Sequence, residues 1–288
     1  MTRSAASAPG TGRALRRQRH AENFPVAMRL LPRRLRLDLI AIYEVARTID
    51  DLGDEAPGDR EARLTAFADD LGRVWEGSAP KHPVLRALVP VARRRGLDPV
   101  PFHQLVQANL RDQRVTRYST HADLLGYCAL SADPIGRLVL AVFGVRAPGA
   151  VALSDRVCTA LQLIEHWQDV AEDYGAGRVY LPQADLAAFG VAEPELGRSP
   201  ASPALRGLIL FEVRRTSALL ESGAPLVGRL RGWARIAVAG YVAGGRAAID
   251  AVRRADGDVV SRLVRGRRRD LLRHLVVLLC RSGERGAG

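Results

Sequence analysis

The 288-residue sequence has little cysteine, methionine or aromatic content, a single lysine, and no long apolar run. Its three cysteines, Cys128, Cys158 and Cys280, are odd in number and far apart, so they indicate neither a disulfide framework nor a zinc site. No segment reaches the roughly 18 consecutive apolar residues that a membrane-spanning helix needs. The N-terminus lacks the apolar stretch of a secretory signal peptide. We therefore expect a protein of the reducing cytoplasm, with at most peripheral contact at the inner face of the membrane.

Positive charge is concentrated at the two ends of the sequence. The formal net charge is +12, and residues 1–36 and 253–288 carry all of the positive excess, because the residues between them are slightly acidic. Strong positive charge favours a nucleic acid or an anionic membrane as a partner. Because the arginines are not interleaved with aromatic side chains, the sequence predicts no nucleic-acid binding. A general preference for arginine is the plainer interpretation.

Apolar residues recur at spacings of three and four along most of the chain, and alternating β-branched runs are scarce. This pattern predicts an all-α protein, with helices packed around one cavity in a single domain. We expect a disordered basic tail over residues 1–19, the helical domain over residues 20–280 and a flexible end over residues 281–288. Helices are predicted over residues 24–31, 34–51, 60–75, 83–95, 100–114, 121–145, 150–174, 185–188, 204–223, 232–254 and 259–280.

The first acidic motif, DDLGDE, lies at the end of a predicted helix. Asp50 and Asp54 are four residues apart, as are Asp51 and Glu55. Each pair therefore shares a helix face and can hold one hard cation through carboxylate oxygens. Four acids in six residues repel one another unless a cation compensates them. A solvated acidic helix end is the alternative interpretation.

The second acidic motif reads EHWQDVAED over residues 165–173. Glu165, Asp169 and Asp173 recur every four residues and form one acidic stripe beside an apolar helix face. Carboxylates next to a buried face are costly to desolvate without a partner. Two such stripes therefore indicate carboxylates that face each other across a cavity, bridged by Mg²⁺ and a diphosphate. The cation would neutralise the leaving diphosphate as its C–O bond breaks.

Arginines adjoin both acidic motifs. Arg47 precedes the first motif and Arg178 follows the second, and each guanidinium could hold phosphate oxygens through paired hydrogen bonds. Arg47 could instead be an ion-pair partner of Asp50 and Asp51, one helical turn away. His166 lies one residue off the acidic stripe, so we expect it to pack or to form a hydrogen bond rather than to bind metal.

Three stretches, taken in order, resemble the squalene/phytoene synthase family, whose members join or rearrange prenyl diphosphates head to head. They are HAENFPVAMRLLPRRLRLDLIAIYEVARTIDDLGDE (residues 20–55), YCALSADPIGR (127–137) and WQDVAEDYGAGRVYLP (167–182). The resemblance extends to about residue 274. The first and third stretches are most similar to the hydroxysqualene synthase branch of hopanoid pathways. This similarity implies an isoprenoid synthase fold that ionises presqualene diphosphate, rearranges the cyclopropylcarbinyl cation and captures water.

The resemblance implies roles for particular residues. The family's metal-binding acids fall on Asp50, Asp51, Asp54, Asp169 and Asp173, and the spacing of the second motif adds Glu165 as a Mg²⁺ ligand. Catalytic roles are expected for Asp50, Asp54, Asp169, Asp173 and Arg47. Diphosphate-binding or motif-flanking positions fall on Arg47, Gln168, Arg178 and Tyr180. Positions that line the substrate channel fall on Phe24, Tyr43 and Tyr127.

The chain departs from the family at two positions. Glu165 and Asp133 stand where the family, or its related branch, usually has Asn. The first substitution adds a negative charge to the metal-binding stripe, and the second adds one near the cavity. Asp133 could orient the attacking water as a hydrogen-bond acceptor. The alternative is a helix-capping aspartate before Pro134.

We therefore predict a Mg²⁺-dependent enzyme that converts presqualene diphosphate to hydroxysqualene and releases diphosphate. The near alternative is a squalene or phytoene synthase that condenses two prenyl diphosphates, such as farnesyl diphosphate. A non-catalytic helical protein of the membrane surface is the alternative from another class. The absence of a dinucleotide fingerprint favours capture of water over reduction. The sequence makes no prediction about oligomeric state.

The basic segment over residues 259–280 is expected to contact anionic bilayers. Its apolar residues, Leu263, Leu271, Leu275 and Leu279, lie among arginines. This mixture is typical of helices that lie in the membrane interface. Such a helix would bring the protein to the membrane in which an insoluble triterpene must dissolve.

Overall fold

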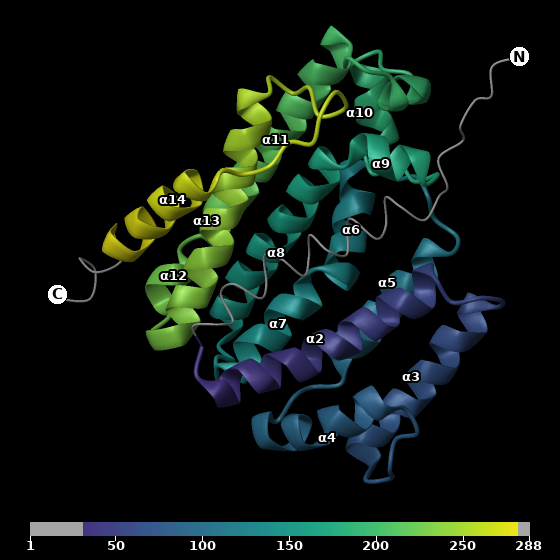
Figure 1. Ribbon diagram of the computed structural model, residues 1–288, viewed down its shortest axis with the longest axis vertical. Helices are drawn as coiled ribbons and strands as arrows, with labels where there is room; N and C mark the ends of the chain where they lie inside the picture. The colour runs from purple at the N-terminus through teal and green to yellow at the C-terminus, as the bar shows by residue number, and fades with distance from the viewer. Residues whose placement is uncertain (1–30, 282–288) are drawn as a thin grey trace, which may run out of the picture.

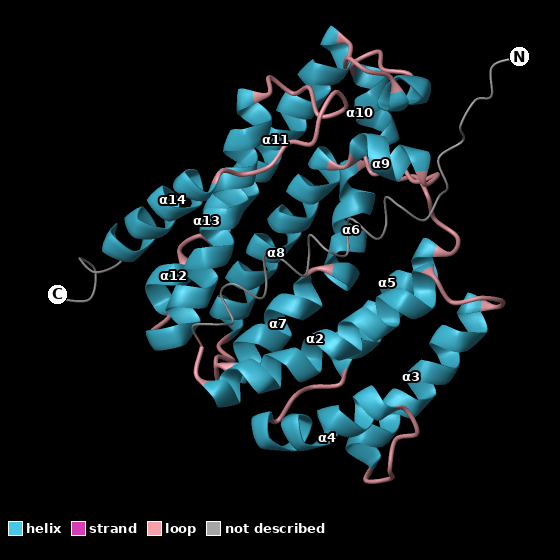
Figure 2. Cartoon of the chain, viewed as in Figure 1, coloured by secondary structure: helices cyan, strands magenta, loops and turns pink. Residues whose placement is uncertain are grey.

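The computed structural model describes residues 31–281, which form helices and no β-sheet (Figure 1 and Figure 2). This confirms the predicted all-α class. The described elements, in chain order, are α2 (Arg33–Asp54), α3 (Arg60–Glu76), α4 (Pro83–Arg95), α5 (Val100–Asp112), α6 (His121–Ser131), α7 (Asp133–Val142), α8 (Pro148–Gln168), α9 (Val170–Gly175), α10 (Gln183–Ala188), the 3₁₀ helix η1 (Glu193–Gly197), α11 (Pro203–Gly223), α12 (Leu226–Arg229), α13 (Gly232–Arg254) and α14 (Arg268–Arg281). The predicted helix over residues 24–31 lies outside the described residues, except for its last position.

Two hydrophobic clusters form the core. One brings together α2, α3, α4, α5 and α7 and contains the fully buried Ile49 and Phe102. The other brings together α6, α8, α11 and α13 and contains Trp167, whose indole N–H donates to Thr216 Oγ1 over 2.8 Å. The two acidic motifs therefore lie on helices that pack in different hydrophobic clusters, the first on α2 and the second at the end of α8. Helix α7 packs against both of these helices and lies between them in Figure 1.

The helix that carries the first acidic motif is longer than predicted. The periodicity predicted a helix over residues 34–51, whereas α2 continues to Asp54 and is capped by Glu55. Asp50, Asp51 and Asp54 therefore all lie within one helix. This supports the prediction that Asp50 and Asp54 share a helix face.

The long helix predicted over residues 121–145 is two helices. The chain turns at Ala132, so that α6 ends at Ser131 and α7 begins at Asp133. Pro134 explains the break, because a proline has no N–H to donate and disfavours helical backbone in the residue before it. By length and mean hydropathy, 1.3, His121–Val142 could cross a bilayer, but 56% of its most apolar 18 residues are buried inside the protein, as in the core helix of a globular fold.

The C-terminal helix begins nine residues later than predicted. Residues 259–267 are not helical, and α14 starts at Arg268. Asp258 accepts a hydrogen bond from the Ser261 N–H, which favours a turn. Gly266 then lies against Ala247 of α13, where a Cβ would be only 3.1 Å from the Ala247 side chain. Close backbone contact with α13 therefore replaces the first turns of the predicted helix.

Candidate active site

The C-terminal half of α2 packs its acidic motif against α5. Asn109 Nδ2 donates a hydrogen bond to Asp50 Oδ1 over 3.1 Å, and Gln113 Nε2 donates to the carbonyl of Gly53 over 2.9 Å. Gly53 permits this approach, because a Cβ at this position would overlap the Asn109 side chain. Contact with α5 therefore orients Asp50, and the helix places Asp54 one turn further along the same face.

Arg178 connects the two acidic motifs. Its backbone N–H donates to the carbonyl of Asp173 over 2.9 Å, and its guanidinium Nη2 donates to Asp54 Oδ1 over 3.1 Å. Nη1 of the same group lies 3.8 Å from Asp112 Oδ2. Burial alone would lower the pKa of this guanidinium, but Tyr180 and the two carboxylates outweigh burial and raise it. Arg178 thus links the end of α9, through its backbone N–H, to the end of α2, through its guanidinium.

Asp112, the last residue of α5, belongs to this site and was not predicted from the sequence. Its Oδ2 accepts a hydrogen bond from the Tyr127 hydroxyl over 2.8 Å. The Asp112 side chain is 10% exposed, and it shares Arg178 with Asp54. Asn109 lies three residues earlier on the same helix face. This polar pair at helical spacing is the one signal in the sequence that could have revealed Asp112.

The second acidic motif spans a bend instead of the continuous helix predicted over residues 150–174. Helix α8 ends at Gln168, Asp169 has φ −104° and ψ 16°, and α9 follows. Backbone hydrogen bonds of helical spacing continue through the bend, from Asp169 N to Glu165 O at 3.0 Å and from Asp173 N to Asp169 O at 2.8 Å. The three acids therefore remain one turn apart. Asp173 is buried, whereas Glu165 and Asp169 are partly exposed.

Aromatic rings pack beside Asp173. His166 stacks on Tyr180 with 3.6 Å between ring centroids, and His166 Nδ1 lies 3.7 Å from Asp173 Oδ2. Tyr180 is 5.9 Å, centroid to centroid, from both Tyr118 and Tyr127. Burial, followed by the neighbouring Tyr180, raises the pKa of Tyr127, so its hydroxyl is neutral and donates its proton in a hydrogen bond. His166 thus packs in the site, as predicted.

Two of the residues predicted to hold diphosphate make other contacts in this structure. Gln168 Nε2 donates to the backbone carbonyl of Val264 over 2.6 Å. Arg47 Nε lies 3.8 Å from Asp51 Oδ2, which is the helical ion pair that the sequence offered as the alternative. Both side chains of this pair are nearly half exposed. Their roles toward a diphosphate stay predictions.

The three residues predicted to line the substrate channel fall in different places. Tyr127 is buried on α6, among the rings beside Asp173. Tyr43 is partly buried on α2. Phe24 lies outside the described residues. The structure therefore places Tyr127 in the candidate site, whereas the channel roles of the other two stay predictions.

Asp133 is the first residue of α7, and its side chain contacts α8. The alternative prediction that it caps a helix is wrong, because α7 begins at Asp133 itself and Ala132 is the cap residue. The buried carboxylate accepts a hydrogen bond from Thr159 Oγ1 over 2.8 Å. Burial raises the pKa of Asp133 to about 6, and the Thr159 hydrogen bond opposes this shift. Its role in orienting water stays a prediction.

The oxygen donors of the two motifs suit a hard cation. Among residues 31–281, no three Asp, Glu, His or Cys side chains converge closely enough to enclose an ion. Mg²⁺ does not need such an enclosure, because it keeps several waters and is usually held by one or two carboxylates with substrate phosphate oxygens. Pairs of carboxylates on α2 and at the α8–α9 bend therefore fit Mg²⁺ bound together with a diphosphate, which stays a prediction.

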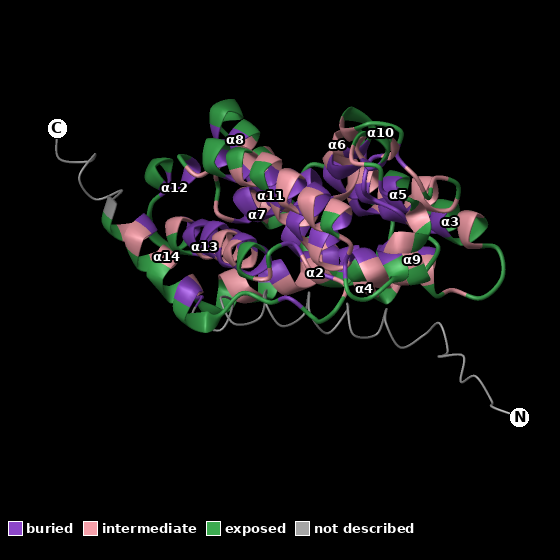
Figure 3. Cartoon of the chain, turned by 90° about the horizontal axis from the view of Figure 1, so that it is seen from above, coloured by how far each residue is buried: buried purple, intermediate pink, exposed green. Residues whose placement is uncertain are grey.

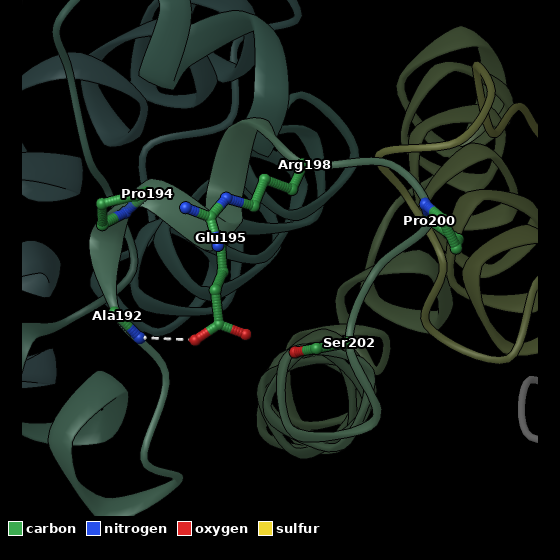
Figure 4. A pocket seen from close by; sticks show the side chains of 6 residues that line it. All are labelled: Ala192, Pro194, Glu195, Arg198, Pro200 and Ser202. Carbon is green, nitrogen blue, oxygen red and sulfur yellow. Dashed lines mark hydrogen bonds between the residues drawn. The ribbon is translucent and has the colours of Figure 1, made fainter.

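Two cavities border η1. The smaller, of about 10 Å³, lies among His166, Asp173, Arg178 and Tyr180, and this volume suits about one water molecule. The larger, of about 310 Å³, is lined by side chains of η1 and the loop after it, which Figure 4 shows around Glu195. It contains none of the predicted site residues. The long apolar cavity therefore stays a prediction.

Comparison with known proteins gives consistent matches. The squalene/phytoene synthase family matches residues 17–273. The hydroxysqualene synthase of Zymomonas mobilis is 36% identical over 203 residues, covering 69% of this chain and 68% of the relative. The presqualene diphosphate synthase of Rhodopseudomonas palustris is 30% identical over 210 residues, covering 72% and 75%. The crystal structure of squalene synthase HpnC from Alicyclobacillus acidocaldarius superposes with a TM-score of 0.78 and 39% identity, covering 86% of this chain and 94% of that chain.

These matches and the helical architecture define the class of the protein, which is an all-α isoprenoid synthase of the head-to-head type. The chain belongs to the squalene/phytoene synthase family, whose members are enzymes of the prenyltransferase type. The resemblance found in the sequence is thereby confirmed, over nearly the extent predicted from residue 20 to residue 274.

Proposed function

We propose that this enzyme converts presqualene diphosphate and water to hydroxysqualene and inorganic diphosphate, with Mg²⁺ as its cofactor, in the cytoplasm. The proposal rests on Arg178, which contacts Asp54 on one side and follows Asp173 on the other. Its guanidinium contacts the carboxylates of Asp54 and Asp112, and its backbone is hydrogen-bonded to the second motif, so it has the charge and position to receive a diphosphate. The 36% identity to a hydroxysqualene synthase supports this choice of reaction.

The residues of both motifs would act on the leaving group. Asp50 and Asp54, with Asp169 and Asp173, would hold Mg²⁺, which as a bound Lewis acid would withdraw charge from the phosphate oxygens. Arg178 would donate hydrogen bonds to the same oxygens. The C–O bond then breaks, and its electron pair leaves with the diphosphate.

The tyrosines near the motifs would act on the carbocation. Ionisation leaves a cyclopropylcarbinyl cation, which opens to an allylic cation. The ring faces of Tyr127 and Tyr180 are electron-rich and uncharged, so they would stabilise positive charge without reacting as bases. Water then forms a new C–O bond at the allylic carbon and passes one proton to the released diphosphate. Asp133 would accept a hydrogen bond from that water. Its carboxylate already accepts one from the Thr159 hydroxyl, and a carboxylate can accept several.

The near alternative is condensation of two prenyl diphosphates. It is favoured by the 30% identity to a presqualene diphosphate synthase. Both reactions begin with departure of a diphosphate, so the two acidic motifs alone do not distinguish them. The non-catalytic alternative is disfavoured, because a surface protein has no need for acidic motifs at the ends of two helices that Arg178 links.

Product analysis in ¹⁸O-labelled water tests the proposed reaction. Presqualene diphosphate, Mg²⁺ and the enzyme, without any nicotinamide, should give a C30 alcohol that carries the label. Asp133→Ala should shift the products toward alkenes while diphosphate release continues. Asp133→Asn, which keeps an oxygen acceptor, should retain more of the alcohol. Mass spectrometry and a diphosphate assay read both outcomes.

Two results would contradict the proposed reaction. An unlabelled hydrocarbon formed only with NADPH would assign the enzyme to the reducing squalene synthases. Accumulation of presqualene diphosphate from farnesyl diphosphate, with no turnover of added presqualene diphosphate, would assign it to the condensing reaction.

A further inference from the structure

Exposed arginines are concentrated between α13 and the first turn of α14. Most half-buried arginines of the described chain face a carboxylate, as Arg137 faces Asp155 at 2.9 Å and Arg117 faces Glu193 at 3.0 Å. Exposed arginines without an ion pair in the described range also occur singly elsewhere, as at Arg63 and Arg156, but here four lie within seven residues: Arg262, Arg265, Arg267 and Arg268. The protein thus presents uncompensated positive charge on one short segment.

Exposed apolar side chains gather on the same part of the molecule. Of the seven large apolar residues that are exposed in the described range, five lie on α14, on the segment before it or on the first two turns of α13: Trp233, Ile236, Leu263, Leu272 and Val276. Leu272 and Val276 are the most exposed, at 58% and 59%. The start of α13 and the end of α14 lie side by side, because Arg235 Nη2 donates to the carbonyl of Leu279 over 2.5 Å. Exposed apolar groups in such numbers indicate an interaction site.

Helix α14 is amphipathic, but not in the way that the sequence predicted. Leu278 is buried, and Leu275 and Leu279 pack against the core, so these leucines are not available to lipid. The outward face contains Leu272 and Val276, one turn apart, together with exposed arginines before and between them. Figure 3 shows α14 at the edge of the molecule with exposed residues along it. Aliphatic side chains beside long arginines suit the boundary between headgroups and acyl chains.

The basic segment also touches the acidic site. The carbonyl of Val264 accepts the hydrogen bond from Gln168 Nε2, at 2.6 Å, and Gln168 directly precedes Asp169. Leu263 and Arg265, on either side of Val264, are both exposed. A surface that binds Leu263 and Arg265 would therefore lie next to the second acidic motif.

We propose that the segment 262–276 docks this enzyme on an anionic phospholipid bilayer. The four uncompensated arginines would contact lipid phosphates, while Leu263, Leu272 and Val276 would insert among the acyl chains. A nucleic acid is the other polyanion that such charge could attract, but residues 255–281 contain no Phe, Tyr or Trp on which a base could stack, and Trp233 is the one exposed aromatic residue of the patch. Docking here would let an apolar substrate and product pass between the bilayer and the acidic site.

Vesicle flotation with the full chain tests this surface. Vesicles of phosphatidylcholine with phosphatidylglycerol should bind the protein, and pure phosphatidylcholine vesicles should not. Arg265→Gln/Arg267→Gln/Arg268→Gln should weaken binding by roughly tenfold to a hundredfold, because each arginine near an anionic membrane surface strengthens binding to it several-fold. Leu272→Ser/Val276→Ser should also weaken it. High salt should release most of the bound protein.

Matched control variants test whether binding depends on this surface or only on the total number of exposed arginines and apolar residues. Arg63→Gln/Arg93→Gln/Arg156→Gln removes three exposed arginines elsewhere, and Leu37→Ser/Val100→Ser removes two apolar residues of similar exposure. Both controls should bind vesicles like the unaltered protein. Equal binding to neutral and anionic vesicles, no binding to either, or equal losses in the controls would overturn the proposal. So would binding to an oligonucleotide without binding to vesicles.

Discussion

Replacing either Asp50 or Asp173 with asparagine is expected to reduce diphosphate release by roughly two to three orders of magnitude. Each substitution removes a carboxylate charge from a different acidic motif. Loss of one preorganised electrostatic contact to a developing anion typically costs about 3–4 kcal/mol of transition-state stabilisation, and every 1.36 kcal/mol is about tenfold in rate. Steady-state release of diphosphate measures the effect.

The same variants should keep their fold. Asparagine retains the oxygen that accepts the Asn109 hydrogen bond at Asp50, and removal of like charge one turn apart relieves repulsion on α2. The helical circular dichroism should be unchanged, and Tm should move by about 3 °C or less. Asp69→Asn, an exposed acid on α3, is the matched control and should retain full activity. Unfolding, or near-normal turnover in either site variant, would make these acids structural.

Arg178→Gln is expected to lower kcat by roughly a hundredfold, and Arg178→Lys by about tenfold. Glutamine removes the charge, whereas lysine keeps it but lacks the planar fork that binds two phosphate oxygens at once. The glutamine variant also leaves Asp54 and Asp112 without their cation, so its Tm should fall. The lysine variant separates the two effects, because its charge preserves the ion pairs.

For Arg178→Lys, the change in kcat has to be compared with the change in Tm. We expect kcat to fall while Tm stays close to that of the unaltered protein. Arg215→Lys is the control, since Arg215 likewise contacts two carboxylates, Asp185 and Glu212, outside the site. A drop in Tm with unchanged kcat at Arg178 would show that this residue only holds helices together.

Helix formation could be predicted from the sequence because it depends on local periodicity. Helix α4 has the predicted bounds, and α3 differs by one residue. The breaks at Ala132 and Asp169 were missed, because apolar spacing continues across both. Pro134 signalled the first of them. The late start of α14 depends on contact between Gly266 and α13, which no local pattern records.

The residues of the candidate site likewise include some that local sequence patterns reveal and some that only tertiary packing brings together. The acids of each motif could be found because helical spacing places them on one face, and Arg178 could be found because it follows the second motif closely. The hydrogen bond from Asn109 to Asp50 joins residues 59 positions apart. The hydrogen bond from Gln168 to Val264 joins residues 96 positions apart. Such pairings depend on how α2 packs on α5 and how α8 packs on the segment before α14, so local periodicity could not reveal them, and the spacing of Asn109 and Asp112 was the one sign of Asp112.

Magnesium-dependent release of diphosphate tests the central claim most directly. The full-length protein should be incubated with presqualene diphosphate and, separately, with farnesyl diphosphate, and inorganic diphosphate should be measured with Mg²⁺, with excess chelator and after Mg²⁺ is restored. The two acidic motifs predict release from at least one substrate with Mg²⁺, none with chelator, and recovery when the ion returns. Release that is equally fast in chelator, or no release from either substrate, would contradict the assignment of these carboxylates to a metal-bound diphosphate.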